Sequence, residues 1–428
     1  MGGFFTGRTL ADLGRALRDG EQTAQDLVTR VLESADPELN AFVDLDPELA
    51  QENARLADKE RARGVDLGPL HGIPVAVKDI IDVAGFRTGM GSAHFDGHLA
   101  EEDAACVRRL RDAGAVIVGK TGTQEFAFGA TGDVSASGPV RNPHDRSRMA
   151  GGSSSGSAAA VAAGTVPLAL GTDTGGSVRI PSAFCGVAGF KPAHGAVPAD
   201  GVFPLSRSLD HVGVLAGSAA DCLTAYRVLA APSGDTGPAA DEAARHGRAA
   251  WIEPPAADPE VVRTVRALFP DAPAEPLDFA GLREVFIAIE FSEAYDVHAE
   301  RIADAPGLYL PATLGRLEES GRMPGWRLVR ALRERDRYAR EIAALLDRYD
   351  YLAMPTMPIT APEIGATENE FGPLTALLVS LTSPWNVLGL PALSVPAGTV
   401  GGLPVGAQLV TRRGAERILF DAAERLTA

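Results

Sequence analysis

Two glycine- and serine-rich turns that flank an apolar segment constrain this chain more than any other feature. They occupy residues 150–192, AGGSSSGSAAAVAAGTVPLALGTDTGGSVRIPSAFCGVAGFKP, and no histidine lies within that stretch. A serine needs a proton acceptor before it can attack a carbonyl carbon. Lys78 is the candidate acceptor, because it lies upstream in the aliphatic run IPVAVKDII, which predicts a buried strand. The pattern indicates a serine hydrolase whose base is a lysine.

The charge and composition of the chain limit the classes of molecule that it can bind and the compartment in which we expect it. Its 428 residues, 45% of them apolar, are enough for a large core. A net charge of −16 would repel phosphate groups, so nucleic acid and anionic membrane surfaces are poor partners. Three scattered cysteines, Cys106, Cys185 and Cys222, predict reduced, packed thiols. The N-terminus has no secretory pattern, and the longest apolar stretch, 158–170, is interrupted by glycine and proline. We therefore expect a cytoplasmic protein.

Strand and helix patterns alternate along the chain. A strand over 73–80, a helix over 101–112 and a strand over 115–120 form a βαβ order, and their nearly continuous apolar strands predict a sheet covered on both faces. Strand-like runs return near the C-terminus in YLAMPT, PALSVPAG and VGAQLV. We expect one large α/β domain over 1–428, with a mixed, mostly buried central sheet and helices on both faces. Its catalytic part would span about 60–230, followed by a connection over about 231–258 and a C-terminal part over 259–428.

Several ordered motifs resemble the amidase signature family. They are HGIPVAVKD, GAVIVGKTGTQEFA, GPVRNPHD, the two glycine-serine turns, YLAMPTMPITAP and PWNVLGLPALSVPAGTVGGLPVGAQLV. The resemblance implies a Ser-Ser-Lys triad that needs no metal and no cofactor. Ser177 in GTDTGGS matches the family's nucleophile, Ser153 lies 24 residues earlier at the position of the second serine, and Lys78 matches the lysine. In the family, the peptide bond before that second serine is cis.

The residues themselves are consistent with these roles. On a strand, Lys78 and Asp79 point to opposite faces, so the ammonium has no carboxylate beside it. Burial then favours the neutral amine, which can take a proton from Ser153 as Ser153 takes one from Ser177. The backbone N–H groups of residues 174–177, Thr174, Gly175, Gly176 and Ser177, can form an oxyanion hole because glycines permit the turn.

Other positions carry weaker predictions. Phe126, Phe128, Thr131 and Trp385 are candidates for a pocket that binds a small amide, ester or carbamate, and core packing explains them equally well. Asp173 and Arg179 are expected to form an ion pair that braces the nucleophile turn. Ser155, Asp133 and Ser135 depart from the family pattern, which leaves the substrate open.

Three alternatives accompany the resemblance. Gly152, Ser154 and Gly156 satisfy G-x-S-x-G, the nucleophile elbow of α/β-hydrolases, with His194 or His211 as base. The glycine turns of a non-enzymatic protein could instead bind an anion. Within the family, the alternative to a free-standing amidase, as a monomer or homo-oligomer, is the glutaminase (A) subunit of a tRNA-dependent amidotransferase. The segment LYLPATLGRLEESGRMPGWRLVRALRERDRYAR resembles the free-standing type.

Overall fold

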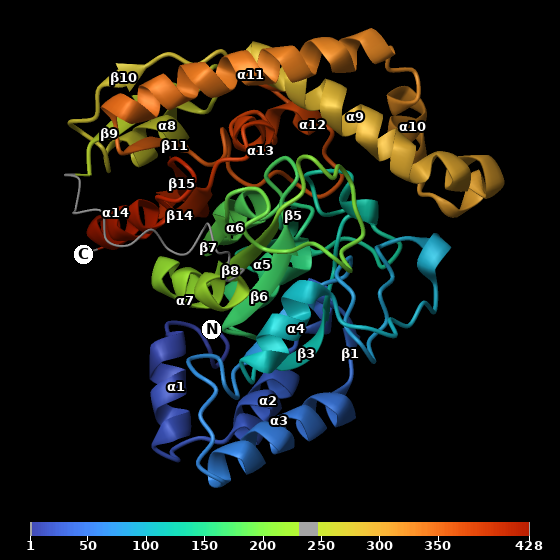
Figure 1. The fold of residues 1–428 in the computed structure, drawn as a ribbon, viewed down its shortest axis with the longest axis vertical. Helices are drawn as coiled ribbons and strands as arrows, with labels where there is room; N and C mark the ends of the chain where they lie inside the picture. The colour runs from blue at the N-terminus through green and yellow to red at the C-terminus, as the bar shows by residue number, and fades with distance from the viewer. Residues whose placement is uncertain (1, 231–246, 428) are drawn as a thin grey trace.

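An 11-stranded mixed sheet runs through the computed structural model, which describes residues 2–230 and 247–427 (Figure 1). Its strands, in spatial order, are β1 (Phe42–Leu45), β3 (Val116–Thr121), β2 (Pro74–Lys78), β6 (Leu168–Thr172), β8 (Val212–Ala216), β7 (Ala188–Lys191), β14 (Ala392–Val400), β15 (Leu403–Val410), β11 (Tyr351–Pro355), β9 (Ala249–Ile252) and β10 (Ala274–Glu275). Strands from both ends of the sequence share this sheet, which confirms the prediction of one α/β domain.

The N-terminal half of the sheet contains the predicted βαβ unit. β2 pairs in parallel with β3, and helix α4 (Ala105–Asp112) connects the two. β6 lies in parallel on the other side of β2. Every residue of these three strands is buried, as their apolar runs predict. Because the carboxyl ends of parallel strands meet at one edge of a sheet, the last residues of β2 and β6 are brought together.

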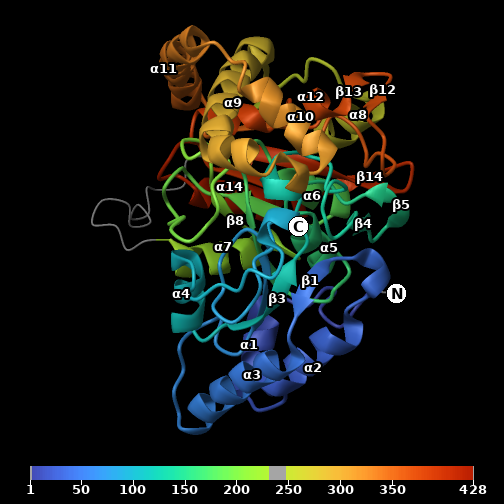
Figure 2. The same ribbon diagram turned by 90° about the vertical axis from the view of Figure 1, so that its right-hand side faces the viewer.

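Helices cover both faces and both ends of the sheet (Figures 1 and 2). They are α1 (Leu10–Arg18), α2 (Ala24–Ser34), α3 (Pro47–Ala62), α5 (Ser155–Ala162), α6 (Arg179–Cys185), α7 (Ala219–Leu229), α8 (Pro259–Arg266), α9 (Phe279–Asp304), α10 (Pro311–Ser320), α11 (Gly325–Arg348), α12 (Leu374–Leu377), α13 (Ser383–Val387) and α14 (Arg417–Thr427). Two small hairpins complete the fold, β4 (Arg141–Asn142) with β5 (Asp145–Met149) and β12 (Glu368–Asn369) with β13 (Gly372–Pro373). In Figure 1, α1–α3 lie at one end of the molecule and α9–α11 at the other.

The segment predicted as a connection, 231–258, contains a strand of the main sheet. Residues 231–246 lie outside the described part of the chain, but β9 pairs in parallel with β11 immediately afterwards. The many Ala, Pro and Asp residues of this segment favour a loop, and the apolar run AAWI is too short to stand out as a strand. In the structure AAWI is β9 and lies between neighbouring strands.

Two further sequence expectations concern membranes and thiols. Among the described residues, each helix is too short or too polar to cross a bilayer. All three cysteines are free and buried. Burial raises the pKa of each thiol, which is the behaviour expected of packed, unreactive cysteines.

Candidate active site

Lys78 and Thr172 meet at the carboxyl edge of the sheet, where β2 and β6 end. The Lys78 Nζ atom lies 2.7 Å from Thr172 Oγ1 and 2.7 Å from Ser153 Oγ. All three side chains are buried. Asp79, the next residue, points elsewhere: its carboxylate lies 3.4 Å from Lys120 Nζ and accepts the Gly89 N–H. Within the described chain, no carboxylate lies within ion-pairing distance of Lys78.

This environment favours the neutral form of Lys78. Burial lowers the pKa of the amine to about 7, although the negative charges of Asp173 and Asp210 act in the opposite direction. Near neutral pH a substantial fraction of Lys78 is therefore unprotonated and can accept a proton from the hydroxyl it contacts.

Ser153 is held against this amine by an unusual backbone. Its peptide bond with Gly152 is cis. A Cβ atom on Gly152 would lie 2.7 Å from the Gly132 nitrogen, so this position has no room for a side chain. The N–H of Ser154 donates to the carbonyl of Ser177 at 3.1 Å, which joins the first serine turn to the second. Ser153 thus contacts Lys78, and the residue after it is hydrogen-bonded to Ser177.

The second turn, residues 173–178, connects β6 to α6. Gly176 has a φ of +135°, and a Cβ atom there would collide with the Thr382 hydroxyl, while one on Gly175 would lie 2.7 Å from the ring of Phe286. Both glycines are therefore required by packing. No hydrogen bond to another described residue occupies the backbone N–H groups of residues 174–177. These donors are free to stabilise a negatively charged oxygen.

A buried ion pair braces this turn, as the sequence predicts. Arg179 donates two hydrogen bonds to Asp173, at 2.9 and 2.7 Å, and its remaining donors reach Gln408, Asn386 and the carbonyl of Thr382. Burial alone would raise the pKa of Asp173, but the adjacent guanidinium holds it well below its usual range. Asp173 also accepts the N–H of Val178. A charged pair with every donor satisfied gives the turn a fixed shape.

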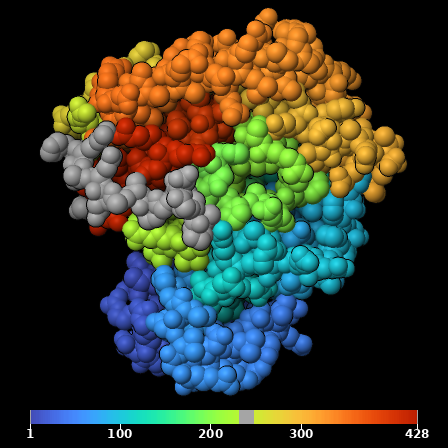
Figure 3. Space-filling view, viewed as in Figure 1, coloured from blue at the N-terminus to red at the C-terminus, as the bar shows by residue number. Residues whose placement is uncertain are grey.

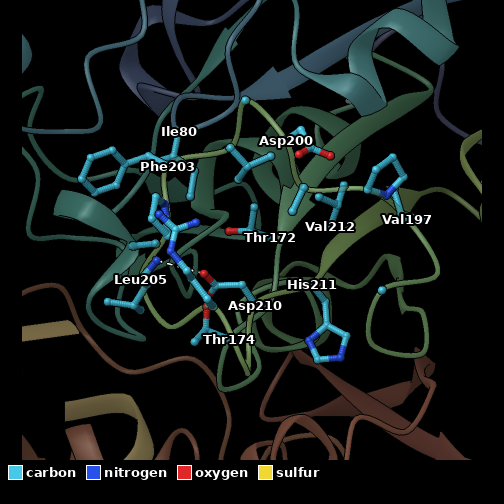
Figure 4. Close-up of a pocket in the computed structure, with 18 of the residues that line it drawn as sticks. Ile80, Thr172, Thr174, Val197, Asp200, Phe203, Leu205, Asp210, His211 and Val212 are labelled. Atoms are coloured by element: carbon cyan, nitrogen blue, oxygen red, sulfur yellow. Dashed lines mark hydrogen bonds between the residues drawn. The ribbon is translucent and has the colours of Figure 1, made fainter. Parts of the chain in front are cut away.

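A cavity of about 530 Å³ opens beside the turn (Figure 4). The loop between β7 and β8 supplies most of its wall, and the lining includes Thr172, which contacts Lys78, and Thr174 of the second turn. In Figure 3 the surface is hollowed where the green residues near position 200 form a ring. Apolar side chains such as Ile80 and Phe203 line one part, while Asp200, Arg207, Asp210 and two histidines supply polar groups.

The four predicted pocket residues lie elsewhere, so their contact with substrate stays a prediction. Phe126 packs in an aromatic cluster with Phe203, and Phe128 packs on Phe291. Trp385 is fully buried and donates to the carbonyl of Leu381. Thr131 donates to Gln124 at 3.0 Å. The cavity includes Ala127, which lies between the two phenylalanines, but it is lined mainly by the loop over 194–212. The sequence drew attention to that loop only through His194 and His211, as bases of the elbow alternative, and did not predict it as a pocket wall.

The three positions that depart from the family pattern have local hydrogen-bond partners. Ser155 donates to the carbonyl of Gly122 at 3.2 Å. Asp133 accepts the N–H of Gly365, and the hydroxyls of Ser135 and Ser137 lie 3.0 Å apart. These contacts tie loops together around the site.

Ser154, the nucleophile of the elbow alternative, is occupied by the backbone of β6. Its hydroxyl donates to the carbonyl of Thr172 at 3.1 Å and accepts the N–H of the same residue at 3.2 Å. His211 is held by the carbonyls of Leu209 and Asp173, and His194 contacts the carbonyl of Arg207. Neither imidazole is hydrogen-bonded to Ser154, so the geometry does not form the elbow's Ser-His pair.

Comparison with known proteins points to the same family as the motifs that form the site. The family model described as Amidase matches residues 26–247 and 312–420, well over half of the chain. The chain belongs to the amidase signature family. This amidase is 35% identical to the A subunit of the glutamyl-tRNA(Gln) amidotransferase from Symbiobacterium thermophilum over 464 residues, which cover 96% of this chain and 95% of the relative.

Two solved structures resemble this amidase over nearly its whole length. One, from a vestigial protein complex that reveals the origins of an s-triazine catabolic enzyme, has a TM-score of 0.90 and 32% identity, covering 98% of both chains. The other, an amidase, has a TM-score of 0.88 and 34% identity, covering 98% of this chain and 99% of that chain. The family model leaves out residues 248–311, which include α8 and α9.

Proposed function

We propose that this amidase hydrolyses a carboxamide C–N bond through an acyl-enzyme on Ser177. The observation that carries the proposal is the 2.7 Å contact between Lys78 Nζ and Ser153 Oγ, in a buried setting that favours the neutral amine. A neutral amine hydrogen-bonded to a serine hydroxyl, next to a turn with free N–H groups, is a proton relay with an oxyanion hole.

The reaction follows from this geometry. Ser177 Oγ attacks the carbonyl carbon while its proton passes to Ser153, whose own proton passes to Lys78. The carbonyl oxygen becomes an oxyanion against the N–H groups of residues 174–177. The relay then runs in reverse and Ser153 delivers a proton to the leaving nitrogen, so the C–N bond breaks and an amine departs. Water attacks the ester of Ser177 and loses a proton to the relay. The bond between the acyl carbon and Ser177 Oγ then breaks, the relay returns the proton to Ser177, and a carboxylic acid is released. Esters and carbamates present the same carbonyl and can enter the same route.

Replacement of the nucleophile tests this proposal. Ser177→Ala is expected to lower the hydrolysis rate by about 10³-fold or more, and a fluorophosphonate should label wild-type protein at Ser177. Ser154→Ala serves as the matched control, because Ser154 is the neighbouring alternative nucleophile. Labelling at Ser154 with full activity in Ser177→Ala would refute the proposal and favour the elbow alternative.

A second candidate, which the curated relatives favour, is the A subunit of an amidotransferase. The relatives that bear this name include proteins 32–36% identical across 94–98% of this chain. In that case glutamine would be the amide, and the ammonia released would serve a companion chain. The free-standing alternative is supported by the similarity to a solved amidase at 34% identity and by the sequence of residues 308–340, which resembles the free-standing type.

Purified protein separates the two candidates. A free-standing amidase, as a monomer or homo-oligomer, should reach its full rate alone on a panel of amides that includes glutamine. An amidotransferase component should hydrolyse glutamine weakly alone and at least tenfold faster with companion chains from a relative's complex. Ser177→Ala would be inactive in both cases, so this experiment tests the assembly and not the chemistry.

A further inference from the structure

Asp210 links the cavity to the catalytic turn. It lies two residues before β8, and its carboxylate accepts a hydrogen bond from the hydroxyl of Thr174 at 2.6 Å. The same carboxylate accepts the backbone N–H groups of Leu205, at 3.0 Å, and Ser206, at 3.1 Å. Figure 4 shows Asp210 beside Thr174, with Thr172 and His211 around the same cavity. One side chain therefore holds both the loop that lines the cavity and the first residue of the oxyanion turn.

We propose that Asp210 is a positioning residue, which fixes the oxyanion turn through Thr174 and, by its negative charge, stabilises the protonated form of Lys78. The inference rests on the proposed function. Asp210 transfers no proton in the proposed mechanism. Its position connects the cavity, where substrate would bind, to the oxyanion turn and to Lys78. A substrate that moved the 205–210 loop would move the turn with it.

The first half of the proposal follows from the hydrogen bonds around Thr174. The oxyanion donors are backbone N–H groups, so their direction depends on how the turn is held at each end. Asp173 and Arg179 brace the turn from the core side. The Thr174–Asp210 bond braces its first residue from the cavity side. A shift of about 1 Å in such donors can cost on the order of 10²-fold in rate.

The second half follows from the contacts that lead from Asp210 to Lys78. Asp210 is hydrogen-bonded to Thr174, and Thr172, two residues earlier in the chain, has its hydroxyl 2.7 Å from Lys78 Nζ. Burial raises the pKa of its carboxyl to about 6, although the Thr174 hydroxyl lowers it. Glu293 on α9, bonded to Ser206 and Ser208, raises it further. The other titratable or charged groups on this side are Lys78, Asp173, His194, Asp200, Arg207 and His211. Above pH 6 Asp210 is an anion, and its charge raises the pKa of Lys78 against the effect of burial.

The rate at which a fluorophosphonate labels Ser177 measures both effects without a known substrate. It should be followed from pH 5.5 to 9 in wild type, Asp210→Asn, Thr174→Val and Asp200→Asn, with thermal unfolding as a check of folding. Asp210→Asn should slow labelling at high pH about tenfold or more. It should also move the acidic limb of the pH–rate profile, where the labelling rate rises with pH, to lower pH by about 0.5 unit, because without the anion Lys78 becomes neutral at a lower pH.

The other variants separate the effect of the Thr174–Asp210 hydrogen bond from the effect of the negative charge of Asp210. Thr174→Val removes the hydrogen bond but keeps the charge, so it should slow labelling with the acidic limb in place. Thr174→Ser returns the hydroxyl and should recover most of that loss. Asp200→Asn removes an exposed carboxylate from the same cavity, where water screens the charge, and should leave the limb in place.

Two results would overturn the inference. One is a folded Asp210→Asn protein whose labelling rate and limb match wild type. The other is an equal shift of the limb in Asp210→Asn and Thr174→Val, which would mean that the fold and not the charge sets it. Failure of the proposed function is distinguishable, because then Ser177 itself would not be labelled in wild type.

Discussion

Two buried lysines on adjacent strands have opposite surroundings. Lys78 ends β2, and Lys120 lies on the parallel strand β3, opposite Val77. Both side chains are fully buried. Lys120 Nζ lies 3.4 Å from Asp79 Oδ1 and 2.8 Å from the Thr88 hydroxyl. Lys78 contacts two hydroxyls and, among the described residues, no carboxylate.

The carboxylate beside Lys120 and the hydroxyls beside Lys78 suit the two lysines to different roles, one structural and one in proton transfer. Burial lowers the pKa of both amines, but the carboxylate of Asp79 opposes that effect at Lys120. At Lys78 the pKa falls to about 7, with the charges of Asp173 and Asp210 opposing burial from outside hydrogen-bond distance. A buried ion pair resists proton exchange, whereas a buried amine among hydroxyls can accept a proton. The same residue type thus supports the sheet at one position and, as proposed, catalysis at the next strand.

The largest expected effect is on activity at Lys78. Lys78→Met keeps the length and buried shape of the side chain but removes the proton acceptor, so the hydrolysis rate should fall about 10³-fold or more. Lys78→Arg should fail as well, since a guanidinium stays protonated. The measurement is the initial rate on an amide that wild type hydrolyses. A Lys78→Met protein with more than a tenth of the wild-type rate would mean that Lys78 is not the proton acceptor, and its contrast with Lys120 would then have no consequence for catalysis.

The next largest effect is on stability at Lys120. Lys120→Met leaves Asp79 buried without its cation, which should cost about 3–5 kcal/mol in the free energy of unfolding. Urea denaturation at pH 7.5 measures this loss. The double variant Asp79→Asn with Lys120→Met removes both charges and should recover part of it. If Lys120→Met were as stable as wild type, the ion pair would not be the structural element described here.

The three proposed catalytic residues could be located from the sequence because their signals are local. The motifs that resemble the amidase signature family and carry Lys78, Ser153 and Ser177 each occupy a short segment, and the resemblance gave the position of each residue. The βαβ unit was predictable for the same reason. Their catalytic roles still depend on the experiments above.

The neighbours of these residues depend on strand pairing and loop packing, which short segments do not encode. Thr172 becomes a partner of Lys78 because β6 lies beside β2. Asp210 reaches Thr174 across 36 residues of sequence. Aromatic residues near the motifs suggested a pocket, yet Phe126 and Trp385 are buried among other side chains, and a loop of mixed composition lines the cavity. An aromatic residue near a motif fits a core and a pocket equally well before the packing is known.

The smallest expected effect is the pH dependence of stability at Lys78. An amine with a pKa of about 7 in the folded state and about 10.4 when unfolded binds fewer protons in the folded state between those values, so wild-type stability should rise with pH across that window. Below pH 7 both states are protonated, and the folded state bears the full cost of a buried ammonium. Lys78→Met carries no such charge and should be more stable than wild type there, by on the order of 1–3 kcal/mol.

That advantage should shrink as pH rises from 7 toward about 10.4, because the wild-type amine is neutral in the folded state over this range and still protonated in the unfolded state. Urea denaturation of the two proteins at pH 6, 8 and 9.5 gives the difference directly, and Lys120→Met is the matched control because its loss comes from the uncompensated Asp79. A difference between Lys78→Met and wild type that stays constant over this range would mean that Lys78 is not neutral in the folded protein. In that case the contrast between the two lysines would lie in their contacts and not in their protonation, and Ser153 would need another proton acceptor.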